Sequence, residues 1–135
     1  MNLLNIVFFF FKTIQLLGSE LMKLFLRING AKIERNVYIS ISAKFLCKKI
    51  EIGKDTQILE NVRIKGNEFI CGDSVVISAN SLFSGSHSIE IGDKSYFGKN
   101  ARIDLSRDVK IGKDVGFGEN SIIWTHGYFP PVDEG

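Results

Sequence analysis

The chain lacks a large excess of charge, and it contains few cysteines. Its 135 residues include 17 Lys or Arg and 15 Asp or Glu, which leaves a net charge of +2. Both signs are interspersed and no basic stripe alternates with aromatic residues, so nucleic acid is not an expected partner. The two cysteines, Cys47 and Cys71, are too few for a disulfide framework and suit a protein of the reducing cytosol.

What the chain does contain is a repeat of about nineteen residues, which occurs five times from Ile33 onwards. Each turn of the repeat consists of three six-residue units, with an apolar residue first in each unit and a small residue fifth in the first two. The leading residues are Ile33, Ile39, Phe45, Ile52, Ile58, Ile64, Cys71, Ile77, Phe83, Ile91, Phe97, Ile103, Ile111, Phe117 and Ile123. The small residues are Val37, Ala43, Thr56, Val62, Val75, Ser81, Ser95, Ala101, Val115 and Ser121. A chance run of β-branched residues would not keep this spacing, so the repeat indicates a solenoid.

A period of six fits neither a helix face nor a plain strand alternation. It predicts short strands joined by corners, with three corners closing a triangular coil whose interior holds the leading residues. Successive coils would stack as parallel strands about 4.8 Å apart, so five coils give a core about 24 Å long. The predicted fold is therefore an all-β solenoid, a parallel β-helix of about five coils over residues 31–135.

Turn-forming residues occupy the predicted corners. Gly and Asn tolerate positive φ, so they suit tight corners; the corner residues singled out are Gly53, Gly92, Gly112, Asn61, Asn80, Asn100 and Asn120. Extra residues such as Ile50–Glu51 and Ile89–Glu90 follow the third unit of a turn. We expect these extra residues to lengthen one corner of every coil.

Residues 1–30 differ from the repeat and predict a helix over residues 2–28, which ends at Asn29-Gly30. The apolar run from Ile6 to Phe11 is too short to span a bilayer, and no basic start marks a signal peptide. Two interpretations stay open. The helix caps the open end of the solenoid, which is the interpretation we favour, or it lies at a membrane surface as a peripheral contact.

From residue 33 onwards the chain resembles the hexapeptide-repeat acyltransferases, which fold as a left-handed parallel β-helix. The most specific part is I-G-K-D-V-G-F-G-E-N-S-I-I-W-T-H, residues 111–126, which looks like the stretch preceding the catalytic histidine of maltose, galactoside and polysaccharide O-acetyltransferases. The left hand is implied by the resemblance, because the usual crossover rule predicts the opposite hand. The resemblance also implies acetyl-CoA as co-substrate, a saccharide acceptor and a homotrimer with its sites between subunits.

His126 is the expected catalytic residue. Acetyl transfer from a thioester to a sugar hydroxyl needs a base, and histidine suits this because its ordinary pKa is near 6.5. His126 would take the hydroxyl proton and pass it to the leaving thiolate, while a backbone N–H stabilises the oxyanion. The alternative is a surface-loop histidine without a role.

Four further residues are candidates for substrate binding. By resemblance, Asn100 matches an asparagine that lines the acceptor site of galactoside acetyltransferases, although it is equally an ordinary corner residue. Asp104 would accept a hydrogen bond from a sugar hydroxyl, one coil before the histidine loop. Trp124 would wall the pocket or cover a corner, and Tyr128 would stack on a sugar face or shield the site.

No metal is expected. The chain has only two histidines, His87 and His126, whereas the β-helical carbonic anhydrases that resemble this fold bind zinc through three histidine ligands.

Other functions remain open at this point. In the family further coils follow the histidine loop and carry much of the coenzyme A site, whereas this sequence ends at Gly135, inside that loop. We therefore expect a C-terminally incomplete β-helix. The leading hypothesis is an acyl-CoA-dependent O-acetyltransferase of polysaccharide or lipopolysaccharide modification, located in the cytoplasm, either free or peripherally at the inner face of the membrane. The alternatives are a non-catalytic β-helix scaffold and a truncated, inactive acyltransferase.

Overall fold

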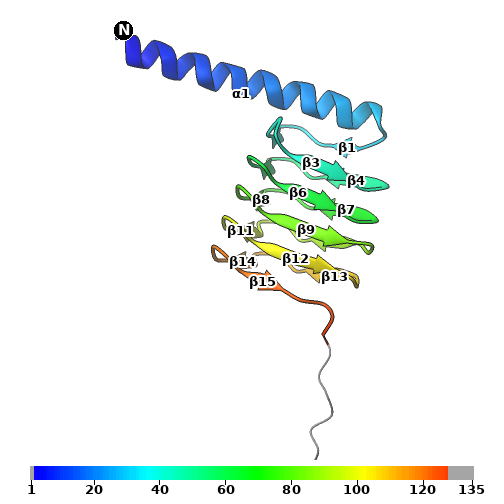
Figure 1. Cartoon of the computed structure of the whole chain (residues 1–135). Coiled ribbons are helices and arrows are strands. Elements are labelled where there is room, and N and C mark those ends of the chain that lie inside the picture. Colours follow the sequence, from blue (N-terminus) through cyan, green and yellow to red (C-terminus); the bar gives the residue numbers. More distant parts are fainter. Residues whose placement is uncertain (1, 128–135) are drawn as a thin grey trace, which may run out of the picture.

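The computed structural model describes residues 2–127, which form one helix followed by a stack of short strands (Figure 1). The helix α1 spans Leu3–Ile28 and lies across the first coil of the stack. Asn2 caps its N-terminus by accepting a hydrogen bond from the backbone N–H of Asn5. Its C-terminus has Asn29 as the cap and Gly30 at a φ of +92°, as the sequence predicted.

Within the described residues the strands form three parallel five-stranded sheets, one for each side of a triangular coil. Sheet A contains β1 (Lys32–Ile33), β4 (Lys49–Ile52), β7 (Glu68–Cys71), β10 (Ile89–Ile91) and β13 (Val109–Ile111). Sheet B contains β2 (Tyr38–Ile39), β5 (Gln57–Ile58), β8 (Val76–Ile77), β11 (Tyr96–Phe97) and β14 (Gly116–Phe117). Sheet C contains β3 (Lys44–Leu46), β6 (Arg63–Lys65), β9 (Leu82–Gly85), β12 (Arg102–Leu105) and β15 (Ile122–Ile123).

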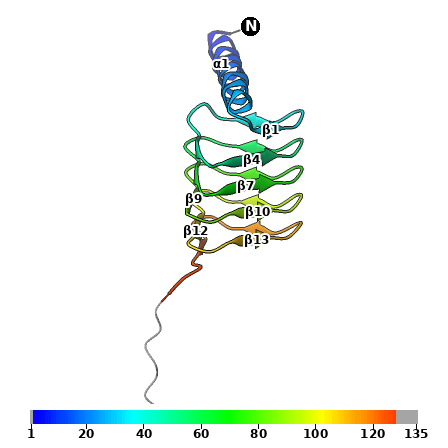
Figure 2. The same cartoon turned by 90° about the vertical axis from the view of Figure 1, so that its right-hand side faces the viewer.

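The chain therefore forms the predicted parallel β-solenoid of about five coils. Each strand pairs with the strand of the next coil, about twenty residues further on, as in Ile33 with Ile52 and Ile91 with Ile111. Figures 1 and 2, which view the stack from two sides, show that the chain winds as a left-handed coil as it proceeds away from α1. The hand expected from the family resemblance is thus the hand of this fold.

The core is a column of the leading residues of the repeat. Ile39, Ile58, Ile77 and Phe97 stack along sheet B, and each has no exposed surface. The small residues at the fifth positions are buried in the first four coils and half-buried in the last. Small side chains are required there because the chain turns a corner over the interior, where bulkier groups would clash.

The corners confirm the asparagine prediction and correct the glycine prediction. Asn61, Asn80, Asn100 and Asn120 all have φ between +58° and +63°, the left-handed region that asparagine tolerates. Gly53 is not among the residues with positive φ; instead, a Cβ on it would lie 2.3 Å from the carbonyl carbon of Gly72. This glycine is needed because corners of successive coils approach closely, and not for its backbone conformation.

The extra residues after the third unit extend strands and do not lengthen a corner. Ile50, Phe69 and Ile89 belong to β4, β7 and β10 and lie in register with one another. All three point inward and are buried. The expectation of a longer corner was wrong because each of these residues lies two positions before a leading residue of the repeat. In a strand, that spacing turns both side chains to the same face, so the extra residues join sheet A and enlarge the core.

The C-terminal half of α1 covers the first coil. Its buried residues are Gly18, Ser19, Lys23 and Leu26, and Gly18 packs closely on Ile41, where an added Cβ would lie 3.3 Å away. Arg27 also donates a hydrogen bond from its guanidinium to the carbonyl of Ile33 at 3.0 Å. The helix thus closes the open end of the stack, as solenoids require of their terminal elements.

The run from Ile6 to Phe11 is too short to span a bilayer, but α1 as a whole is much longer than that run. Among the described residues it is the one helix long and apolar enough to cross a membrane by length and composition, a criterion that core helices and signal sequences also meet. Only 11% of its most apolar window is buried, so α1 is not a core helix of this fold.

We predict that Ser19→Ala lowers the free energy of unfolding by about 1–3 kcal/mol. The buried Ser19 hydroxyl oxygen accepts a hydrogen bond from the backbone N–H of Ile39 at 2.9 Å, at the edge of sheet B that no further strand covers. Alanine would leave that N–H buried without an acceptor. Urea unfolding measures the difference, and Thr13→Ala is the control, because the Thr13 hydroxyl is exposed and donates only within α1. An equal loss of unfolding free energy in the two variants would contradict the proposed contribution of Ser19 to capping the solenoid.

Candidate functional site

The candidate site forms where the last two described coils meet at the end of sheet C. Asp104 belongs to β12, which pairs with β15 through Arg102–Ile122 and Ile103–Ile123. β15 ends at Ile123, and the chain continues through Trp124 to Thr125 and His126. Because parallel strands in register bring equivalent positions of successive coils together, these residues come back over Asp104.

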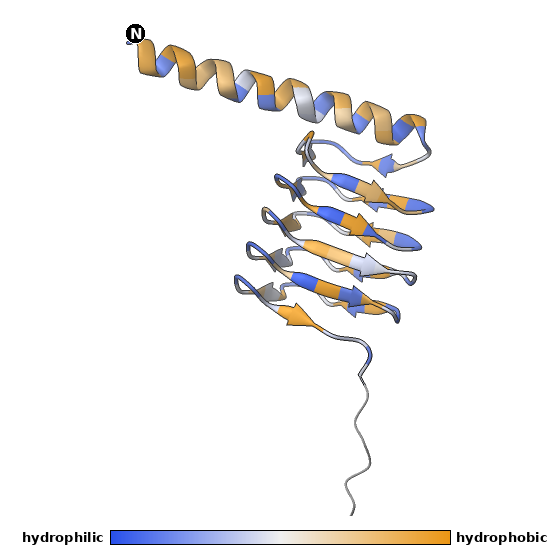
Figure 3. Cartoon of the chain, in the orientation of Figure 1, coloured by the Kyte–Doolittle hydropathy of each residue, from blue (hydrophilic) through white to orange (hydrophobic). Residues whose placement is uncertain are grey.

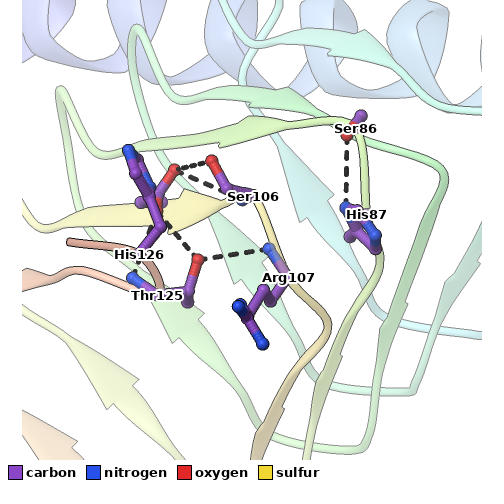
Figure 4. Close-up of polar contacts among 7 residues, drawn as sticks. Ser86, His87, Ser106, Arg107, Thr125 and His126 are labelled. Atoms are coloured by element: carbon purple, nitrogen blue, oxygen red, sulfur yellow. Dashed lines mark hydrogen bonds and ion pairs between the residues drawn. The ribbon is translucent and has the colours of Figure 1, made fainter. Parts of the chain in front are cut away.

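Asp104 is the centre of this cluster, and both of its carboxylate oxygens are occupied. Oδ2 lies 2.7 Å from Nδ1 of His126 and accepts hydrogen bonds from the Thr125 hydroxyl at 2.8 Å and the Thr125 N–H at 3.1 Å. Oδ1 accepts from the Ser106 hydroxyl at 2.8 Å and the Ser106 N–H at 3.2 Å. Figure 4 shows Ser106, Thr125 and His126 converging on one point.

These contacts keep Asp104 ionised. Its partial removal from water tends to raise the pKa of the carboxyl, but the hydrogen bonds from Ser106, Thr125 and His126 outweigh that effect and hold the pKa well below its ordinary value. A carboxylate can only accept, so Nδ1 of His126 is the donor in the shortest contact. In the neutral form of the imidazole, the remaining nitrogen, Nε2, is then the one that carries the lone pair.

The burial of the pair suits a base presented to solvent. The Asp104 side chain is 13% exposed, whereas that of His126 is 58% exposed. Trp124 lies edge-on to the His126 ring, with 6.3 Å between the ring centres. The Thr125 hydroxyl also accepts a hydrogen bond from the N–H of Arg107, which ties the His126 segment to the corner after β12. His126 is therefore held from one side and open on the other.

A groove of about 190 Å³ runs over the outer face of sheet C beside Asp104. It is lined by residues of three successive strands and the segment after them, mainly Leu82, Ser84, Arg102, Asp104, Ile122 and Trp124. Most of this lining is apolar, and Trp124 is among the exposed aromatic residues. An apolar lining with a few polar groups at its edge is typical of sites that bind small molecules.

The structure brings together three of the five residues singled out from the sequence. His126, Asp104 and Trp124 are neighbours, whereas Asn100 lies at the corner before β12, with a φ of +59°. Asn100 precedes Asp104 by four residues of extended chain, about 13 Å, and makes no hydrogen bond to the cluster. Tyr128 lies outside the described residues.

The second histidine stands apart from the cluster. His87 lies in the corner after β9, and its Nδ1 is 3.2 Å from the hydroxyl of Ser86 (Figure 4). Within residues 2–127, no three or more His, Cys, Asp or Glu side chains are grouped so that they could hold a metal ion.

Neither cysteine is prepared for nucleophilic chemistry. Burial raises the pKa of the Cys71 thiol to about 12, and it also raises the pKa of Cys47. A thiol is a poor nucleophile unless it is ionised. Both residues therefore act as small apolar side chains of the solenoid.

Two residues of the cluster were not recognised from the sequence as site residues. Ser106 forms a local turn with Asp104, and the pattern Asp-x-Ser is a known signal for such turns. Thr125 was noted only as part of the histidine loop. The register of β12 with β15 sets Asp104 opposite Trp124, so Thr125 is the next residue along and its hydroxyl reaches the same carboxylate. Asp104 and His126 are separated in the sequence by about one coil, which predicts that they lie close together. Ser106 and Thr125 are near neighbours of these two residues in the sequence, so they fall in the same cluster.

Comparisons of this chain with protein-family models, with curated proteins and with solved structures found no match.

Proposed function

We propose that this protein is an acyl-CoA-dependent O-acyltransferase that moves an acetyl group to a sugar hydroxyl. The observation that carries the proposal is the 2.7 Å contact between Asp104 Oδ2 and His126 Nδ1, on a histidine whose side chain is 58% exposed. The resemblance of residues 111–126 to the segment before the catalytic histidine of O-acetyltransferases supports the same conclusion.

In the proposed reaction His126 is the general base and Asp104 orients it. As the sugar oxygen attacks the thioester carbon, the hydroxyl proton passes to Nε2 of His126. The tetrahedral intermediate carries its negative charge on the former carbonyl oxygen, which a backbone N–H would stabilise. Its collapse breaks the carbon–sulfur bond, and the thiolate takes the proton from Nε2. Asp104 stabilises the imidazolium that exists between the two proton transfers.

The groove beside Asp104 is the proposed acceptor site. Trp124 and Ile122 offer apolar surface to the face of a sugar ring, and Arg102 and Ser84 offer donors to its oxygens. From this groove a hydroxyl would reach the open side of His126. Asp104 is not proposed to bind the sugar directly, because both of its oxygens already accept hydrogen bonds from the protein.

The proposal also includes the setting implied by the family resemblance. Acetyl-CoA is the acyl donor, the acceptor belongs to a polysaccharide or lipopolysaccharide precursor, and the reaction takes place in the cytoplasm. A homotrimer would bring a neighbouring copy of the chain against the exposed side of His126, where the donor thioester needs a second wall.

We predict that Asp104→Asn lowers kcat for acetyl transfer by about tenfold to a hundredfold with little change in KM. The amide presents a neutral oxygen or an N–H₂ group to His126, so it neither fixes the tautomer nor stabilises the imidazolium. Asparagine keeps the size of the side chain and the accepting oxygen for Ser106. Initial rates of CoA thiol release at varied acceptor concentration separate kcat from KM.

Asp108→Asn is the matched control for this variant. Asp108 makes the same kind of contact one corner away, accepting a hydrogen bond from the N–H of Ser88 at 3.0 Å, but it does not contact His126. Its replacement should leave kcat unchanged. If Asp104→Asn and Asp108→Asn lower the rate equally, the carboxylate acts through the stability of the coil and the proposed orienting role is wrong.

A further inference from the structure

A large part of α1 has no partner within the described structure. All of its buried residues fall between Gly18 and Leu26, and Figure 1 shows the N-terminal half of the helix projecting past the edge of the solenoid. Figure 3 shows that this projecting part is almost continuously hydrophobic, whereas the strands below alternate between hydrophobic and hydrophilic residues. Within the described residues, the projecting half of α1 is therefore not buried against the solenoid.

Within the projecting half, the run from Ile6 to Phe11 is apolar on all of its sides. Phe8, Phe9, Phe10 and Phe11 follow one another in the helix, so at 100° per residue they point in four different directions. Each of them is between 63% and 73% exposed. A packed protein helix covers one stripe of its neighbour, whereas the boundary between headgroups and acyl chains receives apolar side chains from more than one side of a helix that lies in it. The four phenylalanines favour a lipid environment over a single partner helix.

An apolar stripe continues along the side of α1 that faces away from the solenoid. Its members are spaced alternately four and three residues apart, and all are exposed: Leu3, Val7, Phe10, Ile14, Leu17, Leu21, Leu24 and Ile28. The buried residues Ser19 and Lys23 lie on the opposite side. The full length of α1 can thus lie against an apolar phase while its other side stays on the first coil.

The geometry favours a helix in the membrane surface over one that crosses the membrane. The free residues 3–17 span about 22 Å at 1.5 Å per residue, which is shorter than the hydrocarbon core of about 30 Å. The rest of α1 is held across the first coil by contacts such as Ser19 with Ile39. An interfacial helix needs only one side in the hydrocarbon, and this arrangement leaves the coil in water.

The charge of the chain is strongly asymmetric, although its total is small. Residues 1–50, which comprise α1 and the first coil, contain eight Lys or Arg and two Asp or Glu, a net charge of +6. Residues 51–135 contain nine Lys or Arg and thirteen Asp or Glu, a net charge of −4. The exposed cations near α1 include Lys32, Arg35, Lys44, Lys48 and Lys49. A basic surface beside an apolar helix is complementary to anionic lipid.

We propose that α1 docks this protein on an anionic lipid bilayer. The phenylalanines of its N-terminal half enter the boundary between headgroups and acyl chains, and the cations of the first coil contact the headgroups. The far end of the solenoid then points away from the membrane. Asp104 and His126 lie at that end, about four coil spacings or 20 Å from the first coil.

This orientation has a consequence that rests on the proposed function. A site held about 20 Å from the lipid would acylate the saccharide portion of a lipid-linked acceptor, several sugars away from the anchor. It would not reach a hydroxyl at the membrane surface. The docking itself does not depend on catalysis, so it is tested separately.

The test is flotation of the full chain with phosphatidylcholine vesicles that contain or lack phosphatidylglycerol. We expect the chain to float with the anionic vesicles and much less with the neutral ones. Phe9→Asp/Phe10→Asp should lower the bound fraction at least about tenfold, and both residues are exposed, so the fold should survive. Lys48→Glu/Lys49→Glu should reduce binding to anionic vesicles, whereas Lys110→Glu/Lys113→Glu at the far end is the matched control and should bind as the wild type does.

Two results would overturn the proposal. One is a chain that stays at the bottom of the gradient with both kinds of vesicle. The other is a Phe9→Asp/Phe10→Asp variant that floats as well as the wild type. If the wild type does not float but sediments as an oligomer that these two substitutions dissociate, α1 binds a second copy of the chain. Flotation does not measure enzymatic turnover. A chain that fails to bind vesicles would therefore not contradict the proposed acyl transfer, and an inactive protein that floats would not contradict the proposed docking.

Discussion

Replacement of His126 by alanine is expected to lower kcat/KM for acetyl transfer by about a hundredfold to ten-thousandfold, the usual contribution of a positioned general base. Without the imidazole, the attacking hydroxyl must release its proton to water while the thioester reacts. The free energy of unfolding should hardly change, because the side chain is 58% exposed and its one hydrogen bond among the described residues is to Asp104. Thiol release from acetyl-CoA measures the rate, and urea unfolding checks the fold.

His87→Ala is the matched control for that experiment. His87 is the other histidine of the chain and lies at a corner of sheet C. Within residues 2–127, the one hydrogen bond of its side chain is with the neighbouring Ser86 hydroxyl. Its loss should leave the rate within about twofold of the wild type. A His126→Ala protein that turns over as fast as His87→Ala would show that His126 is a surface histidine without a role in catalysis.

The largest loss of stability is expected for Phe97→Ala, at about 3–5 kcal/mol. Phe97 is fully buried in the fourth of the five coils. Its ring stacks on Phe117 at 4.8 Å between centres and meets Phe83 edge-on at 5.1 Å, so its removal leaves a cavity between two aromatic rings. The packed coils on either side limit how far the site can collapse. Chemical denaturation monitored by circular dichroism measures the difference.

Tyr96→Ala on the same strand is the control for Phe97→Ala. Tyr96 is the adjacent residue of β11, points to the outside of sheet B and is 47% exposed. Because strand neighbours point to opposite faces, this variant removes a ring of similar size without opening the core. A loss as large as that of Phe97→Ala would contradict the arrangement of the triangular core.

The coil itself could be predicted from the sequence because each residue type in the repeat serves one geometric need. Ile58 and Ile77 lead units in successive coils and stack inside sheet B, as expected. Val62 and Ser81, at fifth positions, are buried without exposed surface. Asn61 and Asn80 adopt positive φ at the corners. A repeat of six residues satisfies all these requirements together, and no competing fold does.

Other details depend on contacts between coils and were not visible in one turn of the repeat. Ile50 and Phe69 extend the strands of sheet A because each finds the other in register on the next coil. Gly53 is required by the carbonyl of Gly72, nineteen residues away. The projection of α1 beyond the stack also could not be predicted, because helix periodicity indicates which residues are apolar and not which of them find a partner.

The candidate site was predicted in part. His126 and Asp104 were singled out separately, and Asp104 was expected to bind a sugar. The fold instead sets its carboxylate against the His126 ring and fills its remaining acceptor positions with Ser106 and Thr125. That arrangement depends on how the segment after β15 returns over β12, which side-chain spacing alone does not reveal. Asn100 shared a coil position with other corner asparagines, and the structure leaves it at a corner.

The measurement that tests the central claim most directly is acceptor-dependent release of CoA thiol from acetyl-CoA by the full chain. Saccharides of polysaccharide and lipopolysaccharide precursors serve as acceptors, and mass spectrometry identifies the product. The histidine–carboxylate pair predicts thiol release that requires both substrates, with one acetyl group appearing on a sugar hydroxyl for each thiol released. Saturable binding of the saccharide without any thiol release would contradict the claim and indicate a non-catalytic β-helix.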